Sequence, residues 1–289
     1  MRTNIKGKFV EVSNGNLKVV LSCLGAAIVE IKYDDDLMTM TPINYDDLSR
    51  EDIYYGKTIG PIANRIKDGL VVIDDKSYYL PLNEKGVCNH SGKDGLSNQL
   101  FDVSIENGRV IFIYKDFMFD GEITYRVIYS FSEDNQIRID YKVTTTNKAI
   151  LSLTNHSFFG LGEPCLDNLT LKVDVDRYIE SDKETLLPLA IKQVEQEIDL
   201  SNNVYDSCFF LKKIKIELKS EKYSLTIDSD YPCVQIYTDN FVDDVLIKNT
   251  NLKTRRAVAI EPEDNLLEKS LINKDEIYHR YITYTFLKR

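Results

Sequence analysis

Apolar and polar residues alternate with a period of two along most of the chain. The alternation is clear in residues 17–21, 109–114 and 137–143, where every second residue is valine, leucine, isoleucine or an aromatic residue. Successive side chains of a β-strand point to opposite faces, so this pattern is typical of strands with one buried face. Short polar clusters such as 106–108 and 132–135 lie between the runs, as hairpin turns do. The pattern predicts antiparallel strands over most of the chain.

Only two segments have the composition of a helix. They are residues 45–52 and 183–194, and Pro188 interrupts the second. Neither segment is long or strongly amphipathic. No internal repeat, low-complexity segment or linker rich in proline, glycine and serine divides the chain. We therefore expect an all-β fold, a large antiparallel β-sandwich that forms a single domain over residues 1–289.

Charge and composition narrow the classes of partner. The net charge is −10, and the charged residues are spread along the chain instead of forming a tail. This favours a neutral small molecule over a nucleic acid or an anionic membrane as the partner. The first residues lack the apolar core of a secretory leader, and no stretch approaches the roughly 20 apolar residues of a spanning helix. A cytoplasmic location is the resulting expectation.

The five cysteines are odd in number and have no Cys-x-x-Cys spacing. This arrangement encodes neither a complete disulfide framework nor a zinc knuckle. We expect ordinary reduced thiols and no metal site at Cys23, Cys88, Cys165, Cys208 and Cys233.

Two residues are candidates for proton transfer. His156 lies between Asn155 and Ser157 where an alternating strand meets two phenylalanines, and its imidazole titrates near neutrality. A hydrogen-bonded core histidine is the simpler interpretation of that segment taken alone. Glu261 ends the apolar run 257–260 ahead of a proline, which makes it the best carboxylate candidate for a general base, although a solvated strand end gives the same pattern.

Three further polar segments interrupt the strands. Asn64 and Arg65 are embedded among small and apolar residues, so Arg65 either points into a pocket or pairs with a buried acid. His90 precedes two small residues that allow close approach of a ligand, but a simple turn has the same composition. Asp206 precedes an apolar run, where a cap or an Asx turn is the local explanation.

Taken in order, these segments resemble the aldose 1-epimerase (galactose mutarotase) family. The family's short motifs have similar counterparts across most of the chain, and six of them occur in the same order. These counterparts are residues 60–66, His90-Ser91-Gly92, residues 154–159, Tyr205–Leu211, Val234–Thr238 and Ile260–Glu263. The family's β-supersandwich agrees with the strand pattern.

The resemblance implies a reaction and assigns roles. Glu261 matches the general base that takes the proton of the anomeric hydroxyl, and His156 matches the general acid that protonates the ring oxygen. The ring of an aldohexose opens, the aldehyde rotates, and the ring closes to the other anomer without metal or cofactor. The residues that match the family's sugar site are Asn64, Arg65, His90, Asp206 and Gln235. Since the chain has no tryptophan, an aromatic wall is expected from Phe158, Phe159, Tyr237, Phe101 or another phenylalanine or tyrosine.

Departures from the family pattern keep other functions open. The chain has Pro61, Ser91, Gly160 and Glu263 where the family commonly has arginine, glycine, asparagine and glutamine. A second carboxylate near Glu261 either raises its pKa by repulsion or points outward without effect. The alternatives are a hexose-6-phosphate 1-epimerase and a non-catalytic sugar-binding protein of the same fold. The phosphate would require cations, for which the candidates are Lys57, Arg65, Lys67 and Lys93. The pattern is compatible with a monomer or a weak homodimer.

Overall fold

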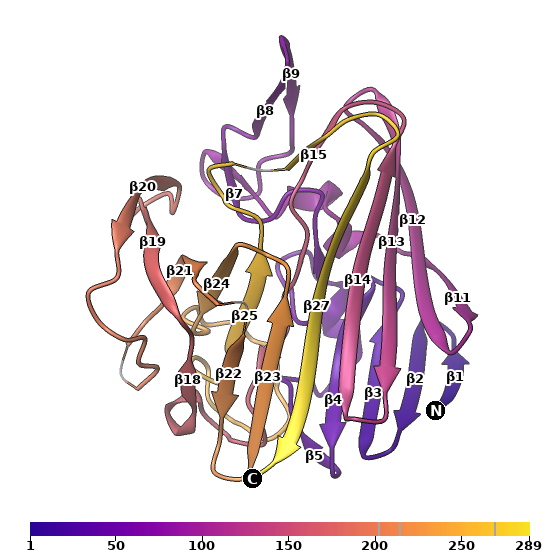
Figure 1. The fold of residues 1–289 in the computed structure, drawn as a ribbon, viewed down its shortest axis with the longest axis vertical. Coiled ribbons are helices and arrows are strands. Elements are labelled where there is room, and N and C mark those ends of the chain that lie inside the picture. Colours follow the sequence, from indigo (N-terminus) through magenta and orange to yellow (C-terminus); the bar gives the residue numbers. More distant parts are fainter. Residues whose placement is uncertain (202, 214, 269) are drawn as a thin grey trace.

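The computed structural model describes residues 1–201, 203–213, 215–268 and 270–289 and is built almost entirely of antiparallel strands (Figure 1). Three sheets of eight, six and five strands make up most of it, and four pairs of short strands connect them. The expected all-β fold with large antiparallel sheets is therefore confirmed.

The largest sheet has the strand order β11-β12-β13-β14-β27-β23-β22-β18. Strand β14 alternates strictly, so that Ile137, Ile139 and Tyr141 are buried on one face. The strand β27 lies between β14 and β23, although it comes last in the sequence. The bounds are Asp102–Glu106 (β11), Arg109–Met118 (β12), Gly121–Ser132 (β13), Gln136–Thr145 (β14), Ile277–Lys288 (β27), Tyr223–Ser229 (β23), Ile216–Lys219 (β22) and Thr170–Lys172 (β18).

The second sheet has the order β17-β25-β24-β21-β19-β20. Its two faces have different compositions, because apolar residues such as Val234, Ile236 and Ile260 point to the main core while the residues between them are largely polar. This polar face carries the site described below. The bounds are Phe158–Phe159 (β17), Val258–Glu263 (β25), Cys233–Tyr237 (β24), Asp206–Leu211 (β21), Val175–Ser181 (β19) and Pro188–Gln193 (β20).

The remaining strands form the N-terminal sheet and the four connecting pairs. The N-terminal sheet runs in sequence order from β1 to β5, with bounds Arg2–Lys6, Phe9–Asn14, Leu17–Ser22, Ala27–Tyr33 and Asp36–Leu37. The pairs are β6 with β16 (Thr58–Ile59, Thr154–Asn155), β7 with β10 (Arg65–Lys67, Val87–Asn89), β8 with β9 (Leu70–Ile73, Lys76–Tyr79) and β15 with β26 (Ala149–Leu151, Ser270–Ile272). The hairpin β8–β9 projects from the body of the molecule (Figure 1).

One connected apolar core joins the three sheets. It contains Val19 of the N-terminal sheet, Phe112 of the largest sheet and Ile260 of the second sheet, all fully buried. A shared core is expected of a single domain, but the division of the chain into domains stays a prediction.

The helix predictions were right for one segment and wrong for the other. Residues 45–52 contain a short 3-10 helix at Tyr45–Ser49, and the other 3-10 helices are Gly92–Asp94, Leu96–Asn98 and Leu166–Asn168. Residues 183–194 instead contain the edge strand β20, which begins at Pro188 and pairs with β19. An edge position tolerates proline because one side of the strand needs no backbone donor.

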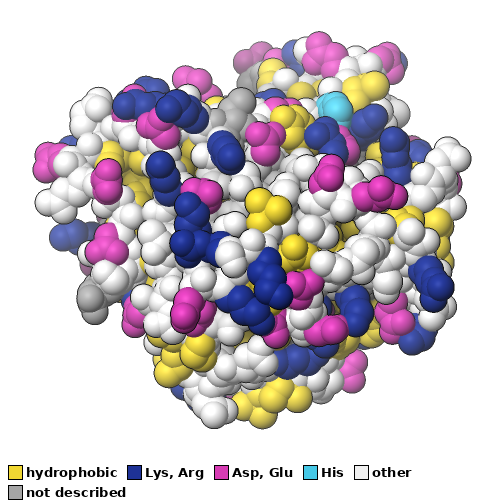
Figure 2. Space-filling model, turned by 60° about the horizontal axis from the view of Figure 1, so that its bottom comes forward, with side chains coloured by type: hydrophobic (Ala, Val, Ile, Leu, Met, Phe, Trp, Pro, Cys, Tyr) yellow, Lys and Arg dark blue, Asp and Glu magenta, His cyan; other side chains and the backbone are white. Residues whose placement is uncertain are grey.

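The structure also bears on the membrane and cysteine expectations. Within the described ranges, no helix has the length and apolar character required to cross a membrane. All five cysteines are free thiols. Positive and negative side chains are intermixed over the face displayed in Figure 2, so this face offers no uniform basic surface.

Candidate active site

Three neighbouring strands of the second sheet place polar side chains next to one another. Gln235 on β24 lies opposite Glu261 on β25 and opposite Cys208 on β21. Asp206, two residues before Cys208, therefore shares their face. The Gln235 side chain donates a hydrogen bond of 2.6 Å to Asp206. The alternation that buries Val234 and Ile236 thus turns a row of carboxylates and an amide away from the core.

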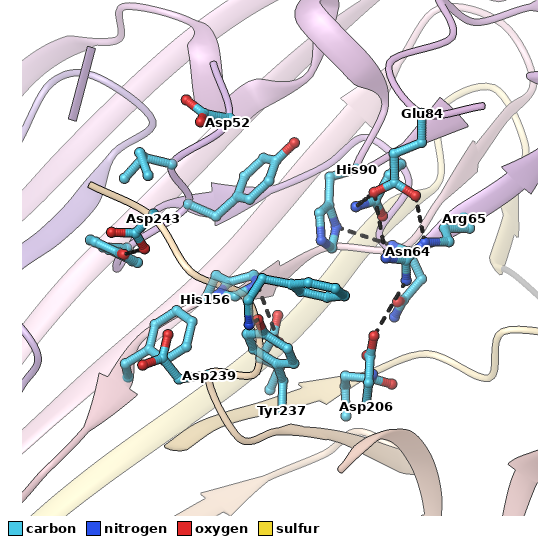
Figure 3. Close-up of a pocket in the computed structure, with 18 of the residues that line it drawn as sticks. Asp52, Asn64, Arg65, Glu84, His90, His156, Asp206, Tyr237, Asp239 and Asp243 are labelled. Atoms are coloured by element: carbon cyan, nitrogen blue, oxygen red, sulfur yellow. Dashed lines mark hydrogen bonds and ion pairs between the residues drawn. The ribbon is translucent and has the colours of Figure 1, made fainter. Parts of the chain in front are cut away.

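This row forms one wall of a cavity of about 270 Å³ (Figure 3). The opposite walls come from the segment after β16 and from the loops at β7 and β10. All seven residues singled out from the sequence line the cavity: Asn64, Arg65, His90, His156, Asp206, Gln235 and Glu261. Residues that are up to 197 positions apart in the sequence, from Asn64 to Glu261, therefore meet at one place.

His156 and Glu261 face each other inside the cavity. The His156 Nε2 atom lies 3.6 Å from Glu261 Oε1, and both side chains are almost completely buried. Short backbone hydrogen bonds fix the histidine, because its N–H donates to Lys57 and its carbonyl accepts from Gly56. The pair can exchange one proton with a ligand that lies against both atoms.

Burial dominates the electrostatics of this pair. It lowers the pKa of His156 to about 4, and the positive charge of Lys57 adds to the shift. Burial also raises the pKa of Glu261 well above its ordinary value, and the charges of Glu263 and Asp206 add to that shift. Both changes favour the uncharged forms, a neutral imidazole beside a protonated carboxyl group.

Arg65 lines the cavity, as one of its two interpretations expected, whereas the acid that it bonds, Glu84, is exposed and not buried. Its guanidinium bonds Glu84 at 2.8 Å, and it lies 3.8 Å from Asp206 while lining the cavity. Burial raises the pKa of Asp206, whereas the charge of Arg65 and the hydrogen bond from Gln235 oppose that shift. Arg65 is thus held in place by acids and still available to a ligand.

His90 and Asn64 are coupled through the backbone. The Asn64 N–H donates to Nδ1 of His90 at 3.2 Å, which places the hydrogen of a neutral His90 on Nε2. Both residues have positive φ angles, 61° for Asn64 and 53° for His90. Such backbone conformations are uncommon for residues other than glycine and occur often at functional sites.

Aromatic residues form the rest of the wall. Phe158 and Tyr237 line the cavity, whereas Phe159 and Phe101 lie in the main core. Tyr54, which the sequence did not single out, stacks on His156 with 5.7 Å between ring centroids and an interplanar angle of 27°. One tyrosine among 18 carries no local signal, and only the fold brings this one to the cavity.

A buried ion cluster supports the cavity wall at Asp239 and Asp243, which the sequence also did not single out. Arg256 is fully buried and bonds Asp239 through Nε and Nη2, each at 2.7 Å. Its Nη2 also bonds Asp243 at 2.7 Å and Tyr55 at 3.1 Å. Arg256 therefore ties the loop that carries Phe241 and Val242 to strand β25.

The cavity is rich in carboxylates and poor in cations. Among the described residues that line it, Arg65 is the only lysine or arginine. Lys57 is completely buried and does not line the cavity, and Lys67 and Lys93 are exposed elsewhere. The carboxylates on its walls are Asp52, Glu84, Asp206, Asp239, Asp243 and Glu261. Three of the four proposed phosphate ligands are thus outside the cavity.

The architecture is that of the galactose mutarotase-like all-β proteins. The structure of a GalM/aldose epimerase homologue from C. elegans superposes with a TM-score of 0.87 at 22% identity, over 99% of both chains. The structure of galactose 1-epimerase from Lactobacillus acidophilus has the same TM-score at 20% identity, over 100% of this chain and 99% of the other. At these identities the similarity establishes the fold.

Sequence comparison gives the family. The family model described as aldose 1-epimerase matches residues 8–285, so the chain belongs to the aldose 1-epimerase family. It is 26% identical to a galactose mutarotase of Rattus norvegicus and 28% identical to one of Homo sapiens. Each of these alignments covers 222 residues, 67% of this chain and 64% of the relative. The aligned region is thus slightly less than two thirds of those proteins.

Proposed function

We propose that this protein interconverts the α and β anomers of a free, unphosphorylated hexose such as galactose or glucose. One observation carries the proposal: a carboxylate and an imidazole 3.6 Å apart, Glu261 and His156, line the same cavity as a set of polar side chains. Those side chains combine donors with acceptors, as sugar hydroxyls require.

The reaction requires one group that accepts a proton and one that donates a proton. Glu261 takes the hydrogen of the anomeric hydroxyl while His156 protonates the ring oxygen, and the bond between the anomeric carbon and the ring oxygen breaks. The resulting aldehyde rotates about its bond to the second carbon. Ring closure on the other face returns both protons, with the two residues in exchanged roles.

The pair needs a single proton between its two members. The directions of the two pKa shifts favour that proton on Glu261. A bound sugar donates hydroxyl hydrogens to the carboxylate, and hydrogen bonds to a charged form favour it. Substrate binding therefore lowers the cost of the state in which Glu261 is ionised and His156 is protonated. The two groups titrate as a unit.

The charge distribution in the cavity favours a neutral sugar over a sugar phosphate. A phosphate would enter a space with six carboxylates and one guanidinium, which already contacts Glu84 and Asp206. We expect kcat/KM for glucose to exceed that for glucose 6-phosphate by at least about tenfold, or about 1.4 kcal/mol. Equal values for the two substrates, or a preference for the phosphate, would replace this proposal by a hexose-6-phosphate 1-epimerase.

Polarimetry on freshly dissolved α-anomers tests the activity. The protein is expected to accelerate the approach to the anomeric equilibrium for at least one hexose over the buffer rate. No acceleration with galactose, glucose or other aldoses between pH 4 and pH 9 would contradict the proposal. Sugar binding in the absence of turnover would then identify a binding protein of the same fold.

A further inference from the structure

Glu263 is a second carboxylate on the polar face of β25. It is completely buried, and it lies two residues after Glu261 on the same side of the strand. This spacing separates the two Cα atoms by about 6.6 Å. The residue opposite Glu263 on β24 is Cys233. The carboxylate is therefore enclosed by the protein and does not point to solvent.

The side chain of Glu263 contacts a residue of the cavity wall. The amide nitrogen Nδ2 of Asn64 donates to Glu263 Oε2 over 2.8 Å, between residues 199 positions apart. Glu263 also influences the thiol of Cys208. A hydrogen bond with Cys233 and burial raise the pKa of Cys208, and the charge of Glu263 adds to the shift. Through its hydrogen bond with Asn64, Glu263 acts on a residue that lines the cavity.

The chemistry of the two groups determines which atom of Asn64 remains for a ligand. The contact uses the NH₂ end of the amide, because Asn64 Nδ2 donates to an oxygen of the Glu263 carboxyl group. The amide plane of Asn64 is then oriented with its carbonyl oxygen Oδ1 directed away from Glu263. Asn64 lines the cavity, so this oxygen is the polar atom that its side chain presents there.

We propose that Glu263 is a positioning residue that makes Asn64 a hydrogen-bond acceptor for one hydroxyl of the bound sugar. The proposal rests on the sugar-binding cavity of the proposed function and specifies its substrate class. The sugar must carry a hydroxyl that donates at the position facing Asn64. An analogue with a group that cannot donate at that position leaves Oδ1 without a donor, and sites of this kind reject such analogues.

Deoxyfluoro sugars test the proposal, because fluorine replaces a hydroxyl without being able to donate. Dissociation constants are measured by ¹⁹F NMR titration for the 2-, 3-, 4- and 6-deoxyfluoro analogues of the preferred hexose, and by competition for the hexose itself. For the wild-type protein we expect one position at which fluorine weakens binding by about tenfold, the loss of one hydrogen bond. The variant Glu263→Met removes the acceptor of the Asn64 amide. In this variant the loss of affinity caused by fluorine at that position is expected to fall to about twofold or less.

Two further variants separate positioning from a general loss of structure. Glu30 is another buried carboxylate, bonded to Lys248 and Tyr45 outside the cavity, and Glu30→Gln is expected to keep the wild-type preference at every position. Asn64→Ala is expected to lose the same single preference as Glu263→Met. Thermal unfolding of each variant shows whether it is folded. If Glu263→Met is unfolded, Glu263→Gln takes its place, and a reduced preference at the same position is expected.

Failure of the positioning role can be distinguished from failure of the proposed reaction. The same samples report anomer exchange by ¹⁹F exchange spectroscopy, so binding and turnover are read independently. Position-selective binding without exchange would contradict the proposed activity and leave the role of Glu263 supported. Equal fluorine effects at all positions in the wild-type protein, or an unchanged preference in a folded Glu263 variant, would overturn the positioning role.

Discussion

At the scale of single residues, burial shifts the pKa values of Glu261 and His156 in the directions that favour their uncharged forms. Neither group is prepared for its task by its own environment, since the pKa of Glu261, the general base, is raised and that of His156, the general acid, is lowered. What the geometry provides is a shared proton and two atoms 3.6 Å apart. A reaction that needs one donor and one acceptor can use such a pair in either direction.

Removing either member of the pair tests its role. Glu261→Gln and His156→Gln are each expected to lower kcat for mutarotation by about 10² to 10⁴-fold, because each removes one proton-transfer group. Sugar binding is expected to persist. The matched control is His279→Gln, since His279 is exposed on β27 and pairs with Asp140 outside the cavity. Polarimetry measures the rates; a kcat within twofold of wild type in either site variant would argue against acid and base roles.

The pH dependence follows from the directions of the two pKa shifts. Below about pH 4, His156 becomes protonated while Glu261 is protonated as well, so neither member of the pair can accept a proton. As pH rises through the raised pKa of Glu261, the pair loses its only proton, and no donor remains. The groups that face Glu261 are Glu263, Asp206 and His156, with the rings of Tyr141 and Tyr284 nearby.

Glu263→Gln removes one negative charge from this environment. Because that charge raises the pKa of Glu261, its loss is expected to move the bell-shaped profile of kcat/KM toward lower pH. The profile is measured from pH 3 to pH 10 with a neutral hexose. A shift toward higher pH in the variant is the outcome that this electrostatic account does not allow.

At the scale of the elements, strands with a clear alternation were predictable, whereas strand β20 and most irregular segments were not. The alternation in 137–143 predicted a half-buried strand, and β14 has that pattern. The residues Arg65, Asp206 and Glu261 were found because each is a polar residue beside an apolar run. Tyr54 and Asp243 gave no such signal, since they lie outside regular strands. Their positions depend on contacts with residues distant in sequence, which a periodic pattern does not encode.

The ion cluster at Arg256 provides a test at this scale. Arg256→Met leaves the buried carboxylate of Asp239 without its cation, which is expected to cost about 3 to 5 kcal/mol of the free energy of unfolding. Lys115→Met serves as the control, because the pair of Lys115 and Glu122 is exposed and contributes at most about 1 kcal/mol. Urea unfolding measures both. Similar losses in the two variants would show that the cluster does not hold the loop.

At the scale of the whole molecule, the three sheets share one core. Residues of each sheet belong to the same apolar cluster, and the two other clusters among the described residues are much smaller. A structure of this kind is expected to unfold cooperatively. The single-domain prediction for residues 1–289 therefore has a thermodynamic consequence.

Unfolding in urea measures this cooperativity with two independent probes. Far-UV circular dichroism reports the strands, and fluorescence of the 18 tyrosines reports the core without interference from tryptophan. The two transitions are expected to have the same midpoint. A separate transition for part of the signal would divide the chain into two folding units. A hexose at 100 times its Kd is expected to raise the free energy of unfolding by about 2.7 kcal/mol.

The inner position of β27 has a consequence for biosynthesis. This strand is translated after β14 and β23, yet it lies between them and pairs with both. While a ribosome is still making residues before 277, each of those strands exposes an unpaired edge to solvent or to a chaperone. The largest sheet is joined into one piece only when residues 277–288 have left the exit tunnel. A nascent chain stalled before that point is therefore the form of this protein most prone to aggregation.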